Sequence, residues 1–252
     1  MMNFVMESPM RFANSRCLRP AIAVRKRMRM PGLAAFASLL TFSSLATAQG
    51  VGRDDAKVLH LLQEPRHRTV YKQDDLFLID LQINPGDTTY AHTHNQAILR
   101  VRISDENGPL RGDVTSDTSY VRDPFTHTLH NDGVAIIHNV LLINDSNGVT
   151  RDTNDTPEGV TAEPVLENSW FRAYRIELSP GESTALQTHK NPTVIIQGTP
   201  GVLHVTRSDG ITHELAKAGA WAWRDAGSAF AVHNTGDSTV VVAISEGRRQ
   251  AR

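Results

Sequence analysis

An internal repeat constrains the fold of this chain more than any other feature of its sequence. The stretch "LFLIDLQINPGDTTYAHTH", residues 76–94, returns as "FRAYRIELSPGESTALQTH", residues 171–189, and a Glu-Pro pair precedes each copy. Farther along, "HTLHNDG" at 127–133 returns as "FAVHNTG" at 230–236. Two copies of one unit predict two similar domains in tandem rather than one large domain.

The repeated unit has the pattern of β-strands. Apolar residues alternate with polar ones in short runs, and no stretch keeps a helical period. One face of the first copy carries four apolar side chains at alternate positions, namely Phe77, Ile79, Leu81 and Ile83. We therefore expect an all-β protein with two antiparallel barrels, at residues 62–145 and 163–246, joined by a polar linker or long surface loop at 146–162.

The first copy resembles the first motif of the cupin superfamily. That motif is Gly, five residues, His-x-His, and then Glu after three or four more residues. Gly86, His92 and His94 match its first half, whereas the Glu position falls on Ile98 or Leu99. This departure puts the family's fourth ligand in question.

The second cupin motif, His followed four positions later by Asn, is matched by His127 and Asn131. The chain is thus similar to bacterial two-domain, bicupin-like exported cupins of unassigned function. The resemblance implies jelly-roll barrels of the double-stranded β-helix type, and a metal site formed by His92, His94 and His127. It implies no single activity, because cupins include dioxygenases, isomerases, epimerases, binding proteins and storage proteins.

The spacing of His92 and His94 agrees with a metal site. Residues i and i+2 of a strand project from the same face, so both imidazoles can approach one ion if a neighbouring strand supplies a third ligand. The alternative is that both lie on a solvent-exposed face. Three imidazoles without a carboxylate favour zinc, iron, nickel or copper over magnesium or calcium. Ligation needs neutral imidazoles, so we expect metal affinity to fall below about pH 6.5.

The second copy of the repeat has lost two of the three histidines of the predicted metal site. Gln187 replaces the first histidine, Phe230 replaces the histidine of the second motif, and only His189 remains. We therefore expect at most one ion per chain, in the first barrel.

Two residues near the histidines are candidates for binding a small organic substrate. Gln96 could approach the open side of the ion, and Arg100 could clamp a carboxylate by paired hydrogen bonds. The alternatives are a surface loop for Gln96 and an outward-facing charged strand for Arg100. His130 and His233 stand at equivalent places before Asn-x-Gly turns, which favours a structural role.

The N-terminal 48 residues have the pattern of a secretory signal peptide. A basic stretch, "RKRMRM", precedes an apolar run and the small-x-small sequence Ala46-Thr47-Ala48. A start at Met28 or Met30 would give a more usual length. The apolar run is short for a membrane span, so we expect a periplasmic or secreted protein that does not span a membrane.

Charge narrows the range of partners. Residues 1–48 hold seven of the 26 Lys and Arg but one of the 27 Asp and Glu, so without them 19 basic face 26 acidic side chains, a net charge of −7. Such a chain has no basic surface for nucleic acid. The single cysteine, Cys17, also lies in this segment. Three readings remain open: a metal-dependent enzyme, a small-ligand binding protein, and a scaffold with vestigial histidines.

Overall fold

The computed structural model describes residues 57–150 and 155–250, and the predicted signal peptide lies outside them. Sixteen strands and two short 3-10 helices, but no α-helix, form this part of the chain. The strands of its first half are β1 (Leu59–His60), β2 (His67–Gln73), β3 (Leu76–Ile83), β4 (His92–His94), β5 (Ala97–Asp105), β6 (Gly108–Asp117), β7 (Phe125–His127) and β8 (Ile137–Asn144). The helices are η1 (Leu61–Gln63) and η2 (Ser119–Val121).

The second half is built in the same way. Its strands are β9 (Leu166–Glu167), β10 (Phe171–Leu178), β11 (Thr193–Gln197), β12 (Leu203–Arg207), β13 (Thr212–Leu215), β14 (Trp221–Arg224), β15 (Phe230–Asn234) and β16 (Val240–Gly247). The predicted all-β fold is confirmed. No helix in the described residues is long and apolar enough to cross a membrane.

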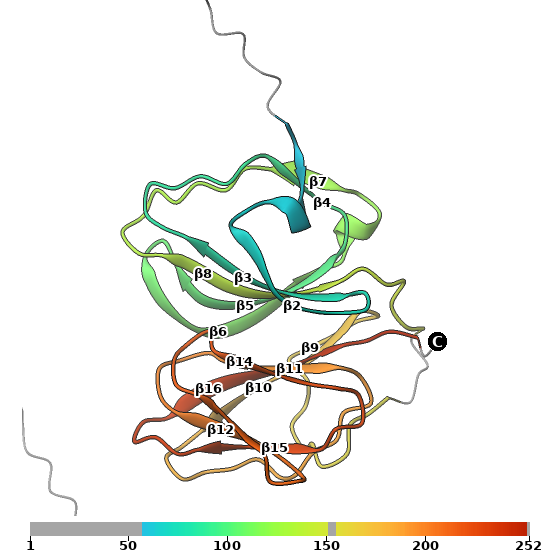
Figure 1. The fold of residues 1–252 in the computed structure, drawn as a ribbon, viewed down its shortest axis with the longest axis vertical. Helices are drawn as coiled ribbons and strands as arrows, with labels where there is room; N and C mark the ends of the chain where they lie inside the picture. The colour runs from blue at the N-terminus through green and yellow to red at the C-terminus, as the bar shows by residue number, and fades with distance from the viewer. Residues whose placement is uncertain (1–56, 151–154, 251–252) are drawn as a thin grey trace, which may run out of the picture. The chain divides into compact units, whose positions relative to one another are not determined.

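Each half consists of one five-stranded and one three-stranded sheet (Figure 1). The first half has the strand orders β2-β3-β8-β5-β6 and β1-β4-β7, and the second half has β14-β11-β16-β10-β9 and β13-β12-β15. All pairings are antiparallel except the short one between β1 and β4. Two facing sheets per half are the jelly-roll arrangement that the cupin resemblance implied, and its occurrence in both halves agrees with the repeat.

Both faces of β3 are buried, for different reasons. Ile79, Leu81 and Ile83 form the core inside the first barrel, with Phe77 packed against them, as the alternation predicted. The opposite face, with Leu76, belongs to a second core cluster that also contains residues of the other half, such as Phe171, Val194 and Ala243. The first four residues of β3, Leu76 to Ile79, are therefore apolar on both faces, whereas Asp80 is partly buried and Gln82 is exposed.

One asparagine holds the same three hydrogen bonds in both copies. The side-chain nitrogen of Asn131 donates to the carbonyl groups of Ile83 and Ala135 at 2.8 Å, and its oxygen accepts from the Gly133 amide. Asn234 makes the corresponding bonds to Leu178, Ser238 and Gly236. Buried amides satisfied in this way fix the corner of each barrel.

The Pro-Gly turns are tied to the same corners. Gly86 and Gly181 have φ values of 81° and 78°, which suit the third residue of a type II turn. The amide of Gly86 donates to the carbonyl of Asn131, and that of Gly181 to the carbonyl of Asn234. These turns therefore set where the following strand, which in the first half carries His92, enters its barrel.

The polar segment between the halves makes specific contacts where the structure describes it. Asp155 is 8% exposed and accepts hydrogen bonds from the guanidinium groups of Arg172 and Arg248. Glu158 pairs with Thr188 in an isolated β-bridge. A sequence rich in polar residues thus supplies one buried carboxylate to the second half.

Candidate metal centre

The structure places His92 and His94 inside the first barrel. They lie on β4, in the middle of the three-stranded sheet, and are 0% and 5% exposed. The alternative of a solvent-exposed face is therefore excluded. Strand β7 runs beside β4 with His127 directly opposite His92.

The three histidines that the sequence singled out come together. The ring centroids of His92 and His127 are 4.7 Å apart, and those of His94 and His127 are 4.9 Å apart. The Nε2 atoms of His94 and His127 are separated by 3.0 Å. His127 is partly exposed, so it lies toward the open side of the group.

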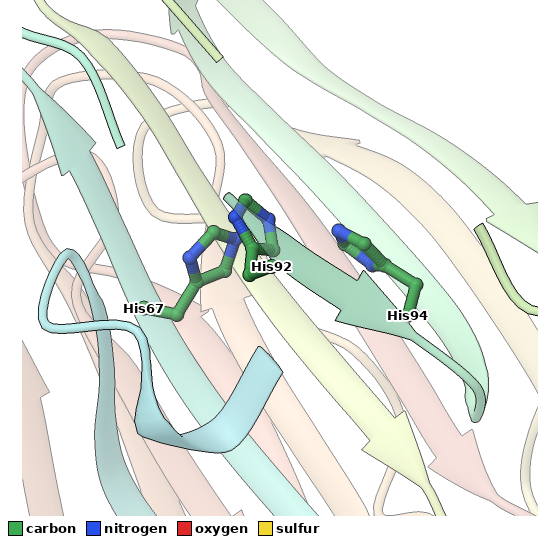
Figure 2. A group of neighbouring side chains, drawn as sticks. All are labelled: His67, His92 and His94. Carbon is green, nitrogen blue, oxygen red and sulfur yellow. The ribbon is translucent and has the colours of Figure 1, made fainter. Parts of the chain in front are cut away.

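A fourth histidine, His67, joins them from the opposite sheet. It begins β2 and is 4% exposed, and its ring centroid is 4.5 Å from that of His92 and 6.0 Å from that of His94. One nitrogen of each of these three residues lies within 4.8 Å of the others (Figure 2). The group thus spans the barrel between its two sheets.

The sequence analysis missed His67 because no local spacing marks it. It reaches the site through sheet pairing, in which His67 lies opposite Leu81 of β3, whose side chain faces the barrel core. The one available signal was the Glu-Pro pair of the repeat, three residues before His67. The Glu-Pro pair indicates a structurally equivalent segment in the two copies, but it does not by itself predict a metal ligand.

Glu64 anchors His67 and organises the approach to β4. Its carboxylate is 1% exposed, and Oε2 accepts from Nδ1 of His67 at 2.9 Å and from the amide nitrogens of Arg66 and His67. Its other oxygen accepts from the amide of Tyr90, while the carbonyl of Tyr90 accepts from Nδ1 of His92 at 2.8 Å. With both Nδ1 atoms donating outward, the Nε2 atoms of His67 and His92 carry the free lone pairs.

The imidazoles are held neutral by their surroundings. Burial is the main cause that lowers the pKa of His67 to about 4 and that of His94 to about 3, and neighbouring imidazoles add to it. Burial also lowers the pKa of His127. Burial would raise the pKa of Glu64, but hydrogen bonds from His67 and Tyr90 outweigh this and keep it below its usual value. The contact between His67 and Glu64 is therefore a neutral imidazole donating to a carboxylate.

These residues fit a metal ion. Nε2 of His92 and Nδ1 of His94 are buried without a hydrogen-bond partner among the described residues, which costs about 1–3 kcal/mol for each group. Two nitrogens bound to one ion at about 2.0–2.1 Å are roughly 3 Å apart, and the Nε2 atoms of His94 and His127 have this separation. Neutral imidazoles with unused lone pairs are good ligands for borderline divalent metals.

The two residues predicted to bind substrate have different environments. Gln96 is 3% exposed, and its amide group contacts Nε2 of His60 at 2.8 Å. Nδ1 of His60 accepts from the amide of Leu62, and Nε2 of His60 also lies 2.9 Å from Oδ1 of Asn95. The Gln96 oxygen is buried without a hydrogen-bond partner among the described residues. Arg100 is partly buried on β5, and its charge contributes to the low pKa of His127 after burial and His92.

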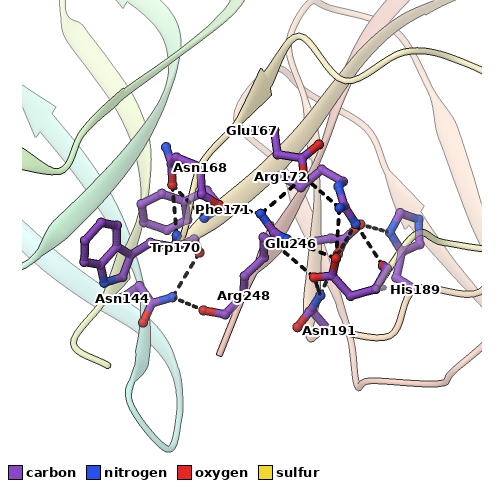
Figure 3. A network of polar contacts seen from close by, with 11 residues as sticks. Asn144, Glu167, Asn168, Trp170, Phe171, Arg172, His189, Asn191, Glu246 and Arg248 are labelled. Carbon is purple, nitrogen blue, oxygen red and sulfur yellow. Dashed lines mark hydrogen bonds and ion pairs between the residues drawn. The ribbon is translucent and has the colours of Figure 1, made fainter. Parts of the chain in front are cut away.

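The equivalent position in the second barrel is a closed hydrogen-bond network (Figure 3). His189 is 1% exposed, and its Nδ1 and Nε2 lie 2.8 Å from Oε1 of Glu246 and 3.0 Å from Oε1 of Gln187. Phe230 stacks on the ring at 5.5 Å. The other oxygen of Glu246 accepts from Asn191. Both ring nitrogens have protein partners, so His189 has no lone pair left for an ion.

No protein-family model matches the sequence, and no curated protein matches it either. The structure is similar to AerE from Microcystis aeruginosa, with a TM-score of 0.52 and 10% identity over 71% of this chain and 90% of that one. It also matches a cupin 2 conserved barrel domain protein from Leptotrichia buccalis, with a TM-score of 0.47, 10% identity and coverage of 72% and 88%. A salicylate 1,2-dioxygenase from Pseudaminobacter salicylatoxidans matches with a TM-score of 0.47, 12% identity and coverage of 68% and 71%. At these identities the likeness is one of fold alone.

Proposed function

We propose that this protein, which has the cupin fold, binds one divalent transition metal ion in its first barrel and a small organic molecule beside that ion. His67, His92, His94 and His127 would hold the metal. The observation that carries the proposal is the set of three buried imidazoles whose nitrogens lie within 4.8 Å of one another. Two of the buried nitrogens in this set, on His92 and His94, have no hydrogen-bond partner among the described residues.

The donor set favours zinc, iron, nickel or copper. Imidazole nitrogen is a borderline donor that suits these ions, whereas magnesium and calcium need several oxygen ligands. The nearest carboxylate, Glu64, is engaged with His67 and backbone amides. A bound ion would supply Lewis acidity toward an oxygen of the small molecule.

The proposal is tested by metal titration of the purified full chain. After chelator treatment, zinc or cobalt is added, the bound ions are counted by elemental analysis, and the cobalt absorption bands report nitrogen ligation. We expect one ion per chain, strongly weakened binding in His92→Ala, and a smaller loss in His127→Ala, since His127 is partly exposed. The metal-free melting curve of each variant shows whether it folds.

His130→Ala is the matched control within the same barrel. The His130 side chain is 43% exposed and contacts Thr88 and Asp132 rather than the cluster. It should bind metal as the unaltered chain does. A chain that binds no zinc or cobalt, or a His130 variant that alone loses metal, would contradict the proposal.

The N-terminal segment leads us to propose further that the protein works in the periplasm or outside the cell. Its basic stretch, apolar run and small-x-small site support export. N-terminal sequencing of the protein recovered from its native compartment should give a chain that begins at or near Gln49. Recovery of the basic segment on a cytoplasmic protein would contradict export.

A further inference from the structure

Arg100 points into the first barrel. On β5 it lies opposite Leu141 of the neighbouring strand, and both Leu141 and the preceding inward residue, Ile98, belong to the core inside this barrel. The alternate residues Leu99 and Val101 belong to the other core cluster. The alternative prediction, that the Arg100 side chain faces outward from the barrel, is therefore excluded.

Arg100 is partly buried, and its guanidinium group makes no close polar contact with the described residues. No hydrogen bond and no ion pair within 4 Å joins Arg100 to any residue in the described parts of the chain. Other arginines of those parts that are removed from water have partners: Arg172 and Arg248 bind Asp155, and Arg102, two residues farther along β5, lies 3.5 Å from Asp105. The charge of Asp117 acts on Arg100 from beyond ion-pair distance, so the guanidinium group keeps its hydrogen-bonding capacity for a bound anion.

The nearest carboxylate is already engaged. Asp117 lies on β6 opposite Ile98, and its Oδ1 accepts from the amide and the hydroxyl of Ser119 at 2.9 and 2.6 Å. Burial would raise the pKa of Asp117, but Ser119, Tyr120 and the charge of Arg100 lower it below its usual value. Asp117 thus holds the 3-10 helix that carries Tyr120 and acts on Arg100 by charge, without a hydrogen bond or an ion pair within 4 Å.

A stacked pair of aromatic rings, called the aromatic wall below, completes the surroundings. The rings of Tyr120 and Phe125 are parallel, with an interplanar angle of 10° and centroids 5.8 Å apart. The Tyr120 ring is 5.3 Å from that of His94, and the Phe125 ring is 5.0 Å from that of His127. Phe125 is 46% exposed, so this wall reaches from the histidines to solvent.

We propose that Arg100 binds the carboxylate of the small molecule, and that this molecule is a flat, unsaturated or aromatic monocarboxylic acid lying against Tyr120 and Phe125. The inference deepens the proposed metal site and rests on it for the molecule's second contact. One guanidinium group neutralises one negative charge and matches a carboxylate with two parallel hydrogen bonds. Phosphate is a weaker match, because its charge at neutral pH exceeds the single charge that one guanidinium group neutralises.

Ligand-observed NMR with benzoate, on zinc-loaded and on metal-free full-length protein, tests the inference. Benzamide has the same shape without the charge, and inorganic phosphate tests for a general anion site. We expect benzoate to bind in preference to both, and Arg100→Gln to weaken it at least about tenfold, as loss of a charge-assisted pair predicts. Arg102→Gln is the matched control, because it removes the same charge two residues along the same face. Arg100→Lys should fall between the two.

The outcomes separate this inference from the metal proposal. If Arg100→Gln binds benzoate as well as the unaltered chain, or if benzamide or phosphate binds equally well, the carboxylate site is wrong whatever the zinc content. If one zinc ion binds per chain and benzoate does not bind, the metal proposal is supported and the proposed carboxylic-acid site is wrong. If zinc fails to bind but benzoate still binds in an Arg100-dependent way, only the carboxylate contact is supported. If neither zinc nor benzoate binds, both the metal proposal and the carboxylate inference are wrong. Zinc content measured in Arg100→Gln should equal that of the unaltered chain.

Discussion

His94 and His189 occupy the same position in the two copies of the repeat and have opposite surroundings. Nδ1 of His94 has no partner among the described residues, and its Nε2 faces another imidazole, that of His127. His189 has a protein partner at each nitrogen and a phenylalanine ring against its face. One scaffold thus produces a group suited to metal in one barrel and a closed polar network in the other.

The difference extends to the sheet beneath each histidine. In the second barrel Glu246 pairs with Arg172 and Thr193 across the five-stranded sheet. At the matching register of the first barrel, Ile143 pairs with Phe77 and Ile98. Apolar residues offer the first group no hydrogen-bond partner, which keeps its imidazoles neutral and their lone pairs unused. A histidine in this fold is therefore a ligand only where its neighbours do not satisfy it.

The strongest test of this contrast makes the same substitution at the equivalent histidine of each barrel. His94→Ala should reduce bound zinc from about one ion per chain to nearly none, because it removes a ligand from the middle of the cluster. His189→Ala should leave zinc content unchanged, although it disrupts the network around Glu246. Elemental analysis of both variants measures this. Loss of metal from the His189 variant would show that the second barrel contributes to binding.

Removal of Glu246 should strongly destabilise the second barrel. Glu246 is 0% exposed and contacts His189 and Asn191, with Arg172 at 3.9 Å. Breaking a buried charged contact by removing one partner costs roughly 3–5 kcal/mol, so Glu246→Ala should lower the free energy of unfolding by about that much.

The His204–Glu214 pair is the control for that effect. It is also a His–Glu contact in the second barrel, at 3.4 Å, but the Glu214 side chain is 59% exposed. Glu214→Ala should change the free energy of unfolding by less than about 1 kcal/mol. Chemical denaturation of both metal-free variants measures the difference, and equal effects would mean that the buried network contributes nothing beyond a surface pair.

A smaller effect is expected where the two Glu-Pro pairs differ. Glu64 is buried and orients His67, whereas its counterpart Glu163 is exposed. Loss of a carboxylate that orients a metal-binding imidazole typically weakens metal affinity about 10–100-fold. Glu64→Gln should show a weakening in this range, and Glu163→Gln should show none. Competition titration with a chromophoric chelator measures both, and an unchanged affinity in Glu64→Gln would remove His67 from the set of ligands.

Sequence patterns predicted those parts of the molecule that local spacing determines. The repeat and the alternation around Phe77 predicted two antiparallel β-barrels, and the resemblance to the cupin motifs implied that they are jelly rolls. His-x-His spacing and the second motif brought His92, His94 and His127 together.

Contacts between distant strands were beyond such patterns. His67 joins the cluster only because β2 pairs with β3, and Asp155 reaches Arg248 from a segment whose composition indicated a linker. A site assembled across two sheets depends on register, and register is a property of the whole fold.

The last expected effect concerns the acid stability of the metal-free protein. His67 and His94 have folded pKa values lowered to about 4 and about 3, against about 6.5 in the unfolded chain. Below pH 6.5, His67 and His94 are therefore protonated in the unfolded state but remain neutral in the folded state. Stability that is fully present above pH 6.5 is lost as the pH falls toward 4, by about 1.4 kcal/mol per pH unit for each such proton.

Urea denaturation between pH 6.5 and 5 isolates this contribution, because most carboxylates remain ionised in that range in both states. His94→Gln should reduce the slope of stability against pH by about one proton, and His67→Gln by a similar amount. Because the folded imidazoles stay neutral to about pH 4, zinc should also stay bound below the pH of 6.5 that model imidazoles suggest. An unchanged slope in both variants would show that these imidazoles titrate normally. The apolar residues Phe77, Ile98 and Ile143 would then not explain why the histidines of the first barrel differ from His189 in the second.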